Sequence, residues 1–185
     1  MAKLYANNHP LNYISYVETS TGLLNFESVC KSAKNNEKHF NNIKHSGCVF
    51  GSDDFCADMG IERDINALLY ARQKIATVCR AFGIDAIDAV YIDFKDRDGL
   101  IEQSLQGKGF GFSGKQLIHP TQIEPVNKAF SPSEDKIEWA TGLIFEFDLA
   151  EKDGRGAFTY RGQMIDRPLL LQARNVLKIA DRSQK

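Results

Sequence analysis

The sequence contains no C-x-x-C pair, no long run of lysine or arginine, and no apolar run near the ~20 residues of a membrane-spanning helix. We therefore expect no membrane association. Its 23 basic and 24 acidic residues nearly cancel, which leaves a formal net charge of −1 and a pI near 6.4. Because no basic cluster stands out, the charge pattern does not fit a nucleic-acid-binding protein.

The cysteine and histidine residues show no metal-site spacing. The four cysteines are Cys30, Cys48, Cys56 and Cys79, and the four histidines do not stand at zinc-ligand spacing with them. This pattern predicts reduced, mostly buried thiols, which suit a reducing compartment. Residues 1–10 contain one lysine, no arginine and no apolar core, so we expect neither a secretory signal nor a transit peptide.

Two kinds of apolar pattern alternate along the chain. Short apolar runs that stop at polar turns predict strands at 12–17, 48–50, 87–92 and 115–118. Apolar residues at three- and four-residue spacing predict helices after these strands, at 23–40, 63–82, 99–106 and 121–130. A strand–helix unit repeated four times indicates a parallel α/β sheet with right-handed crossovers. Beyond it we expect helices at 132–150 and 168–180, with a turn at 152–156 and a short extended segment at 157–160 between them.

The stretch from Gly47 to Gly60 carries the strongest chemical signal. Its apolar run 48–50 stops at a Gly-Ser turn and is followed by two adjacent carboxylates, Asp53 and Asp54. Parallel α/β folds keep their chemistry in the loops that follow the carboxyl ends of the strands. The acidic pair is therefore a candidate metal or acid–base site. The alternative is that one aspartate caps the helix that follows.

Polar residues end all four predicted strands, namely Glu18, Asp54, Asp93 and His119. Because parallel strands place these ends at one edge of the sheet, the four side chains are expected to converge, as in an enzyme site. Glu18 and Asp54 form a natural pair of oxygen ligands for Mg²⁺. Each residue also has a structural alternative. Glu18 could cap the next helix, Asp93 could orient its loop and His119 could satisfy backbone groups at a turn.

Five segments, in this order along the chain, are similar to the citrate lyase β-subunit branch of the HpcH/HpaI aldolase family. They read Y-V-E-T-S-T-G-L-L-N at 16–25, V-F-G-S-D-D-F at 49–55, A-V-Y-I-D-F at 89–94, G-F-S-G-K-Q-L-I-H-P at 111–120 and M-I-D-R-P-L-L at 164–170. The resemblance extends over nearly the whole chain from about Leu11 onward.

The resemblance implies a TIM (β/α)8 barrel, whose strands five to eight correspond to the four strand–helix units of this chain. The family's earlier motifs, including an arginine that grips the substrate carboxylate, have no counterpart here. We therefore expect the C-terminal half of a barrel plus a helical extension. The expected parts are a leader without clear structure at 1–11, a half-barrel with the metal site at 12–130, and an extension with Asp166 at 131–185.

The resemblance also implies roles for individual residues. Glu18 and Asp54 match the family's metal ligands, although Ser52-Asp53 departs from the usual Gly-Glu before the aspartate. Asp166 matches the aspartate that acts as general base or acid, on a segment that packs on a neighbouring subunit in relatives and so implies a homotrimer. Read locally, Asp166 beside Arg167 would be a surface ion pair. The stretch with Ile118 and His119 matches the wall of the coenzyme A pocket.

The activity implied by the resemblance is Mg²⁺-dependent cleavage of (3S)-citramalyl-CoA to pyruvate and acetyl-CoA. Malate synthase and malyl-CoA thioesterase side activities are also implied, and the relatives are mitochondrial. Two alternatives stay open at this stage. The chain could be a truncated, non-catalytic half-barrel that assembles with other subunits, or an aldolase acting on free 2-oxo acids.

Overall fold

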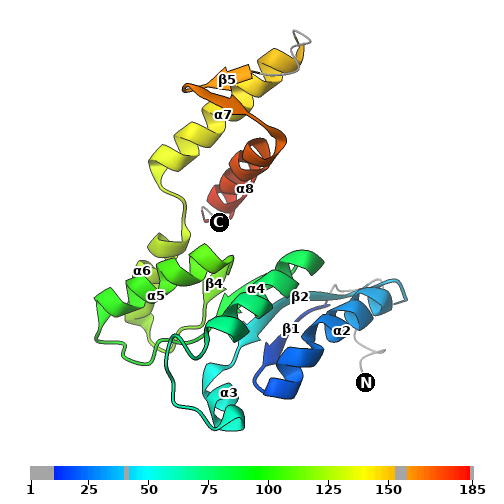
Figure 1. Ribbon diagram of the computed structural model, residues 1–185, viewed down its shortest axis with the longest axis vertical. Helices are drawn as coiled ribbons and strands as arrows, with labels where there is room; N and C mark the ends of the chain where they lie inside the picture. The colour runs from blue at the N-terminus through cyan, green and yellow to red at the C-terminus, as the bar shows by residue number, and fades with distance from the viewer. Residues whose placement is uncertain (1–10, 40–41, 153–157, 184–185) are drawn as a thin grey trace. The chain divides into compact units, whose positions relative to one another are not determined.

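A four-stranded parallel sheet, in the order β1-β2-β3-β4, organises the first part of the computed structural model (Figure 1). Its strands are β1 (Leu11–Val17), β2 (Ile43–Phe50), β3 (Asp85–Asp88) and β4 (Gly114–Lys115). Neighbouring strands pair in parallel throughout. The predicted α/β class with a parallel sheet is therefore confirmed.

The structure describes residues 11–39, 42–152 and 158–183. The chain divides into two compact units, Met1–Phe130 and Ser131–Lys185. The expected leader at 1–11 lies outside the described residues except for Leu11, which begins β1 and so does not belong to an unstructured leader. Most of the expected turn at 152–156 also lies outside the described residues. No closed barrel forms among the residues that the structure describes, in which the parallel sheet has four strands.

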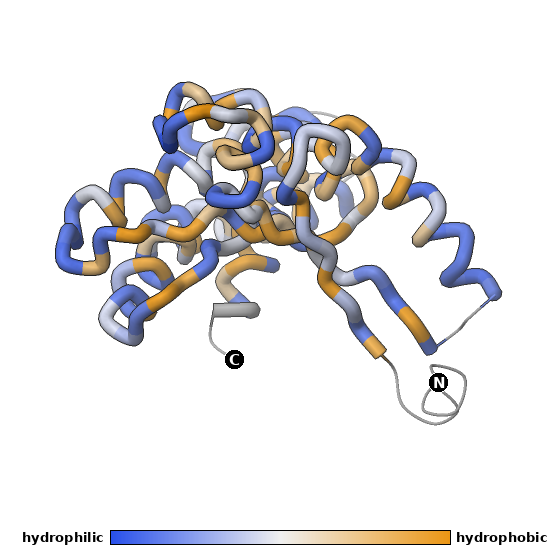
Figure 2. Tube along the Cα trace, turned by 90° about the horizontal axis from the view of Figure 1, so that it is seen from below, coloured by the Kyte–Doolittle hydropathy of each residue, from blue (hydrophilic) through white to orange (hydrophobic). Residues whose placement is uncertain are grey.

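Helices connect the strands of the first unit and cover the sheet. They are α2 (Ser20–Glu37), α3 (Ser52–Met59), α4 (Leu69–Phe82), α5 (Arg97–Phe110), the 3₁₀ helix η1 (Pro120–Gln122) and α6 (Ile123–Phe130). Apolar and polar residues alternate around them, as the hydropathy-coloured trace shows (Figure 2). The apolar stripes of α2 and α4 pack with β2 into one core that includes Leu23, Phe26, Cys30, Cys48, Phe50, Ile75 and Cys79. All four cysteines are buried free thiols, as predicted.

Two strands and one helix are shorter than predicted. The strand predicted at 87–92 ends at Asp88, whose side chain turns into the helix layer and accepts a hydrogen bond from Ala89 N at 2.8 Å. The helix predicted from Arg63 begins at Leu69, because Asp64 accepts hydrogen bonds from the next backbone N–H groups and makes a turn. The strand predicted at 115–118 ends at Lys115, because later amides donate to a side chain instead of a strand.

The second unit contains α7 (Glu134–Lys152), the hairpin strands β5 (Phe158–Tyr160) and β6 (Gln163–Ile165), and α8 (Arg167–Ser183). Its core joins α7 to α8 through Ala140, Leu143, Ile165, Leu170 and Ala173. The hairpin was predicted only in its first strand. Arg161 and Gly162 have φ angles of 48° and 80°, the left-handed conformation that a tight hairpin turn requires.

A buried group of charges ties the sheet of the first unit to its helices. Arg72 of α4 donates to both carboxylate oxygens of Asp88, at 2.9 and 2.6 Å, and to Gln106. Lys115 donates to Ala89 O, and its Nζ lies 3.7 Å from Asp88 Oδ2. Two cations thus share one buried carboxylate at the carboxyl ends of β3 and β4.

This arrangement predicts a stability that rises with pH in the alkaline range. Burial lowers the pKa of Lys115 from its ordinary value of 10.5 to about 8, although Asp88 partly opposes the shift. The unfolded chain therefore binds more protons than the folded chain between these values. The penalty for the charged, buried amine is fully present below pH 8 and disappears as the pH approaches 10.5. Stability should rise by up to about 1.4 kcal/mol per pH unit near pH 9.

Urea unfolding at pH 7, 8 and 9 measures this effect, with Lys115→Met as the comparison. The variant cannot titrate at residue 115, so its free energy of unfolding should lack the rise. An identical pH dependence in both proteins would contradict the assignment to Lys115.

Strand β1 lies at an edge of the sheet and leaves large apolar side chains exposed. Leu11, Ile14 and Tyr16 have exposed fractions of 52%, 54% and 54%. The pattern differs from β2, whose last four residues are all buried. Within the described part of the chain, no helix has the length and apolar character that a membrane span needs.

Candidate active site

The carboxyl end of β1 carries Glu18, directly before α2. Thr19 is the N-cap of this helix, and its hydroxyl accepts a hydrogen bond from Gly22 N at 3.0 Å. The alternative role of Glu18 as the helix cap is therefore wrong. Its carboxylate is left available for another partner.

The side chain of Glu18 lies against the start of α3. A Cβ added at Gly51 would lie 2.7 Å from Glu18 Oε1, so the absence of a side chain at Gly51 makes room for the carboxylate. Gly51 is the N-cap of α3 and makes no side-chain capping bond, whereas Asp53 and Asp54 lie in the first turn. The aspartates are therefore not caps. They lie where the positive end of the helix dipole favours carboxylates.

The two aspartates have different surroundings. Asp53 Oδ1 forms an ion pair with Arg63 Nη1 at 3.1 Å. The same guanidinium donates a hydrogen bond to Val90 O, beyond the end of β3. Asp54 is exposed at the start of the helix. Asp53 thus joins the segments after β2 and β3, and its carboxylate is already engaged by Arg63. This difference favours Asp54 as the metal ligand.

The donor set fits a hard divalent cation with an open coordination sphere. No group of three or more His, Cys, Asp or Glu side chains within the described ranges could hold a metal by itself. Two carboxylates can hold Mg²⁺ when water and substrate oxygens supply its other ligands. Glu18 and Asp54 would be the protein ligands in such a site.

The segment after β3 is held by its own aspartates. Asp93 Oδ1 accepts from Lys95 N at 3.1 Å and from Asp96 N at 3.3 Å, so it orients this loop as the structural alternative proposed. Asp96 caps α5 and accepts a 2.5 Å bond from the Tyr91 hydroxyl. That bond, together with burial, raises the pKa of Tyr91 to about 12. Tyr91 therefore stays protonated at neutral pH and acts as a donor.

Ile118 and His119 follow β4 at the same edge. Ile118 is 53% exposed, and the His119 ring stacks on Phe94 with centroids 4.7 Å apart. His119 Nδ1 contacts the Thr121 hydroxyl at 2.8 Å and accepts from Thr121 N at 3.3 Å. The turn role of His119 is therefore confirmed. An exposed aliphatic side chain beside a stacked aromatic pair is also a suitable surface for an organic ligand.

Asp166 belongs to the second compact unit. Its Oδ1 accepts from Leu169 N at 2.9 Å, so the carboxylate caps the first turn of α8. This bond replaces the surface ion pair with Arg167 that the local sequence indicated. The carboxylate is exposed.

Three further residues of the edge were not singled out from the sequence. Arg63 and Gln122 connect the loops, and the Ser52 hydroxyl is buried without a hydrogen-bond partner among the described side chains. The departure from the family motif at Ser52 was the only sequence signal for any of them.

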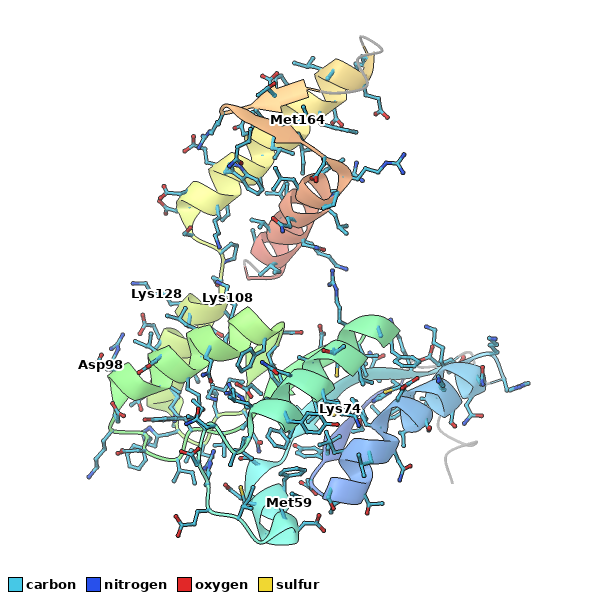
Figure 3. All side chains as sticks on the ribbon, in the orientation of Figure 1. Met59, Lys74, Asp98, Lys108, Lys128 and Met164 are labelled. Carbon is cyan, nitrogen blue, oxygen red and sulfur yellow. The ribbon has the colours of Figure 1, made fainter. Side chains whose placement is uncertain are left out.

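On the far side of the same unit, Lys108 donates to Ala129 O at 3.0 Å and joins α5 to α6 (Figure 3).

The family model described as HpcH/HpaI aldolase/citrate lyase matches residues 5–120. The chain therefore belongs to the HpcH/HpaI aldolase/citrate lyase family, which confirms the resemblance carried by the five segments. It is 47% identical over 173 residues to the mitochondrial citramalyl-CoA lyase of Mus musculus, an alignment that covers 92% of this chain and 51% of that protein. The chain thus spans about half the length of that relative.

Two further similarities extend the comparison. The chain is 39% identical over 137 residues to citrate lyase subunit beta of Leuconostoc mesenteroides subsp. cremoris, covering 73% of this chain and 45% of that protein. Its fold is similar to that of the protein CitE from Mycobacterium tuberculosis, crystallised in complex with magnesium, acetoacetate and coenzyme A. The TM-score is 0.69 and the identity 31%, with 91% of this chain and 60% of that chain covered.

Proposed function

We propose that the chain carries the metal site of a Mg²⁺-dependent acyl-CoA lyase, with (3S)-citramalyl-CoA as substrate and pyruvate and acetyl-CoA as products. The observation that supports this proposal best is Glu18 lying against Gly51, three residues before Asp54. The names of the relatives support the reaction class and the substrate. The magnesium and coenzyme A of the CitE complex support the cofactor and the ligand.

In this proposal the sheet represents strands five to eight of an eight-stranded barrel. Its four parallel strands and the exposed apolar side chains of the edge strand β1 support this interpretation, because such side chains are normally covered. We propose a homotrimer as the functional assembly, and a mitochondrial location by likeness to the mouse relative. Malate synthesis and malyl-CoA hydrolysis would be minor reactions of the same site.

The proposed chemistry assigns distinct tasks to the residues of this chain. Bound Mg²⁺ would act as a Lewis acid on the 2-hydroxy-carboxylate end of the substrate. Glu18 and Asp54 would hold it. Cleavage of the carbon–carbon bond requires loss of the substrate's 2-hydroxyl proton and leaves pyruvate and the enolate of the acetyl thioester. The Asp166 carboxylate, supplied by a neighbouring subunit of the proposed trimer, would accept that proton and return it to the thioester α-carbon. Ile118 and His119 would bind the coenzyme.

The purified chain, incubated with Mg²⁺ and citramalyl-CoA, should release pyruvate in a continuous coupled assay. Asp166→Ala should lower the rate by about 10²- to 10⁴-fold, because general acid–base catalysis typically contributes that much. Asp148→Ala, which removes a carboxylate from α7, is the matched control and should keep the wild-type rate. Absence of pyruvate release above the Asp166→Ala background would contradict catalysis by this chain.

A further inference from the structure

Gln122 joins two loops at the candidate active site. It is completely buried, with an exposed fraction of 0%. Its Nε2 donates to Tyr91 O at 2.8 Å, and its Oε1 accepts from Ile118 N at 2.9 Å and from His119 N at 3.3 Å. Tyr91 follows β3, whereas Ile118 and His119 follow β4. One side-chain amide therefore connects three backbone groups of two separate segments.

The sheet itself does not provide this connection. The ladder between β3 and β4 includes two residue pairs, and the bond that follows it joins Gln116 N to Asp88 O at 3.0 Å. Beyond that bond, Gln122 and the Phe94–His119 stack hold the two segments together. A buried amide whose donor and acceptor are both used in this way gives the backbone a defined conformation.

We propose that Gln122 is a positioning residue for the acyl-CoA ligand. It fixes Ile118 and His119 against the loop after β3, so that the binding surface is already ordered before the ligand arrives. A preordered surface loses less conformational freedom on binding and therefore binds more tightly. The inference rests on the proposed function, because that function gives Ile118 and His119 their ligand.

Gln122→Glu tests the hydrogen-bonding role at nearly constant shape. A carboxylate at this position still accepts from Ile118 N and His119 N, but it repels Tyr91 O. The protonated acid instead donates to Tyr91 O and reproduces the amide. Burial raises the pKa of a carboxyl group, so the protonated form is accessible at mildly acidic pH.

The measurement is the Kd for coenzyme A, by titration calorimetry at pH 8 and pH 5.5. Gln122→Glu should bind about tenfold more weakly than wild type at pH 8 and within about threefold of it at pH 5.5. Gln122→Leu should bind more weakly at both pH values. Gln116→Glu, two residues before Ile118, is the matched control and should follow wild type at both. Equal affinity of wild type and both Gln122 variants at pH 8 would overturn the proposal.

Amide hydrogen exchange provides a ligand-free readout. In Gln122→Leu the amides of Ile118 and His119 should exchange at least about tenfold faster, because they lose their acceptor, while core amides of α2 keep their protection. Unchanged exchange at these two amides would overturn the role of Gln122. If wild type binds no coenzyme A, the proposed function fails, and the exchange rates alone then decide whether Gln122 holds the two segments together.

Discussion

Asp88→Asn is expected to lower the free energy of unfolding of the first unit by about 3–5 kcal/mol. The side chains of Arg72 and Asp88 have exposed fractions of 2% and 0%, and both carboxylate oxygens of Asp88 accept from the guanidinium. Neutral asparagine keeps the volume but leaves Arg72 as a buried cation without a charged partner, and Lys115 loses the carboxylate that favours its charged form. The loss of stability comes from the buried charge that is left unpaired, and it is larger than the net stability that the intact ion pair contributes.

Urea unfolding followed by far-ultraviolet circular dichroism measures the loss. Trp139, the single tryptophan, belongs to the second unit, so its fluorescence serves as an internal reference. Glu124→Gln is the matched control, because it breaks an ion pair with Arg97 whose side chains are 68% and 63% exposed. Exposed pairs contribute little to stability, so this variant should unfold like wild type. Equal destabilisation by both variants would contradict the argument from burial.

Loss of either candidate metal ligand should strongly lower both Mg²⁺ binding and activity. Glu18→Gln and Asp54→Asn each remove one of two carboxylates, and we expect Mg²⁺ affinity to fall by at least about 100-fold. Mutation of a residue that only supports a metal ligand typically lowers metal affinity by about 10- to 100-fold, so we take the upper value as the minimum for a ligand itself. Pyruvate release should fall with it. Titration calorimetry with Mg²⁺ in the presence of pyruvate measures the affinity, since substrate oxygens complete the coordination sphere.

The control is Asp53→Asn, next to the candidate ligand. The carboxylate of Asp53 already pairs with Arg63, so this variant should weaken Mg²⁺ binding by less than about tenfold, the lower end for supporting residues. The assignment would be reversed if Asp53→Asn lost more affinity than Asp54→Asn. Absence of Mg²⁺ binding by the wild-type chain would reject the site in this protein.

The alternation of strands and helices could be predicted because it depends on local apolar spacing. The buried face of α2, with Leu23, Phe26 and Cys30, repeats at the three- and four-residue interval that the sequence shows. Strand ends were harder to predict, because they depend on distant partners. The strand predicted to reach Ile92 ends at Asp88, since that side chain pairs with Arg72, sixteen residues earlier in the chain.

The same distinction applies to the candidate site. Glu18 and Asp54 could be selected because Glu18 directly follows an apolar run and Asp54 follows another after a short turn, so the reason is visible within a few residues. Gln122 could not be selected, because its role depends on Tyr91, which is 31 residues away. A glutamine at the start of a helix normally suggests an exposed polar position. Arg63 was missed for the same reason, since its backbone partner Val90 is 27 residues away.

The contact between Glu18 and Gly51 places an evolutionary restriction on this protein. A β-carbon at residue 51 would occupy space that the Glu18 carboxylate now uses. Even a change as small as glycine to alanine would displace the Glu18 carboxylate without altering either candidate ligand itself. Sequence drift at residue 51 could therefore abolish cation binding in a descendant that still retains both carboxylates. Keeping both candidate ligand residues therefore does not by itself keep their carboxylates in position.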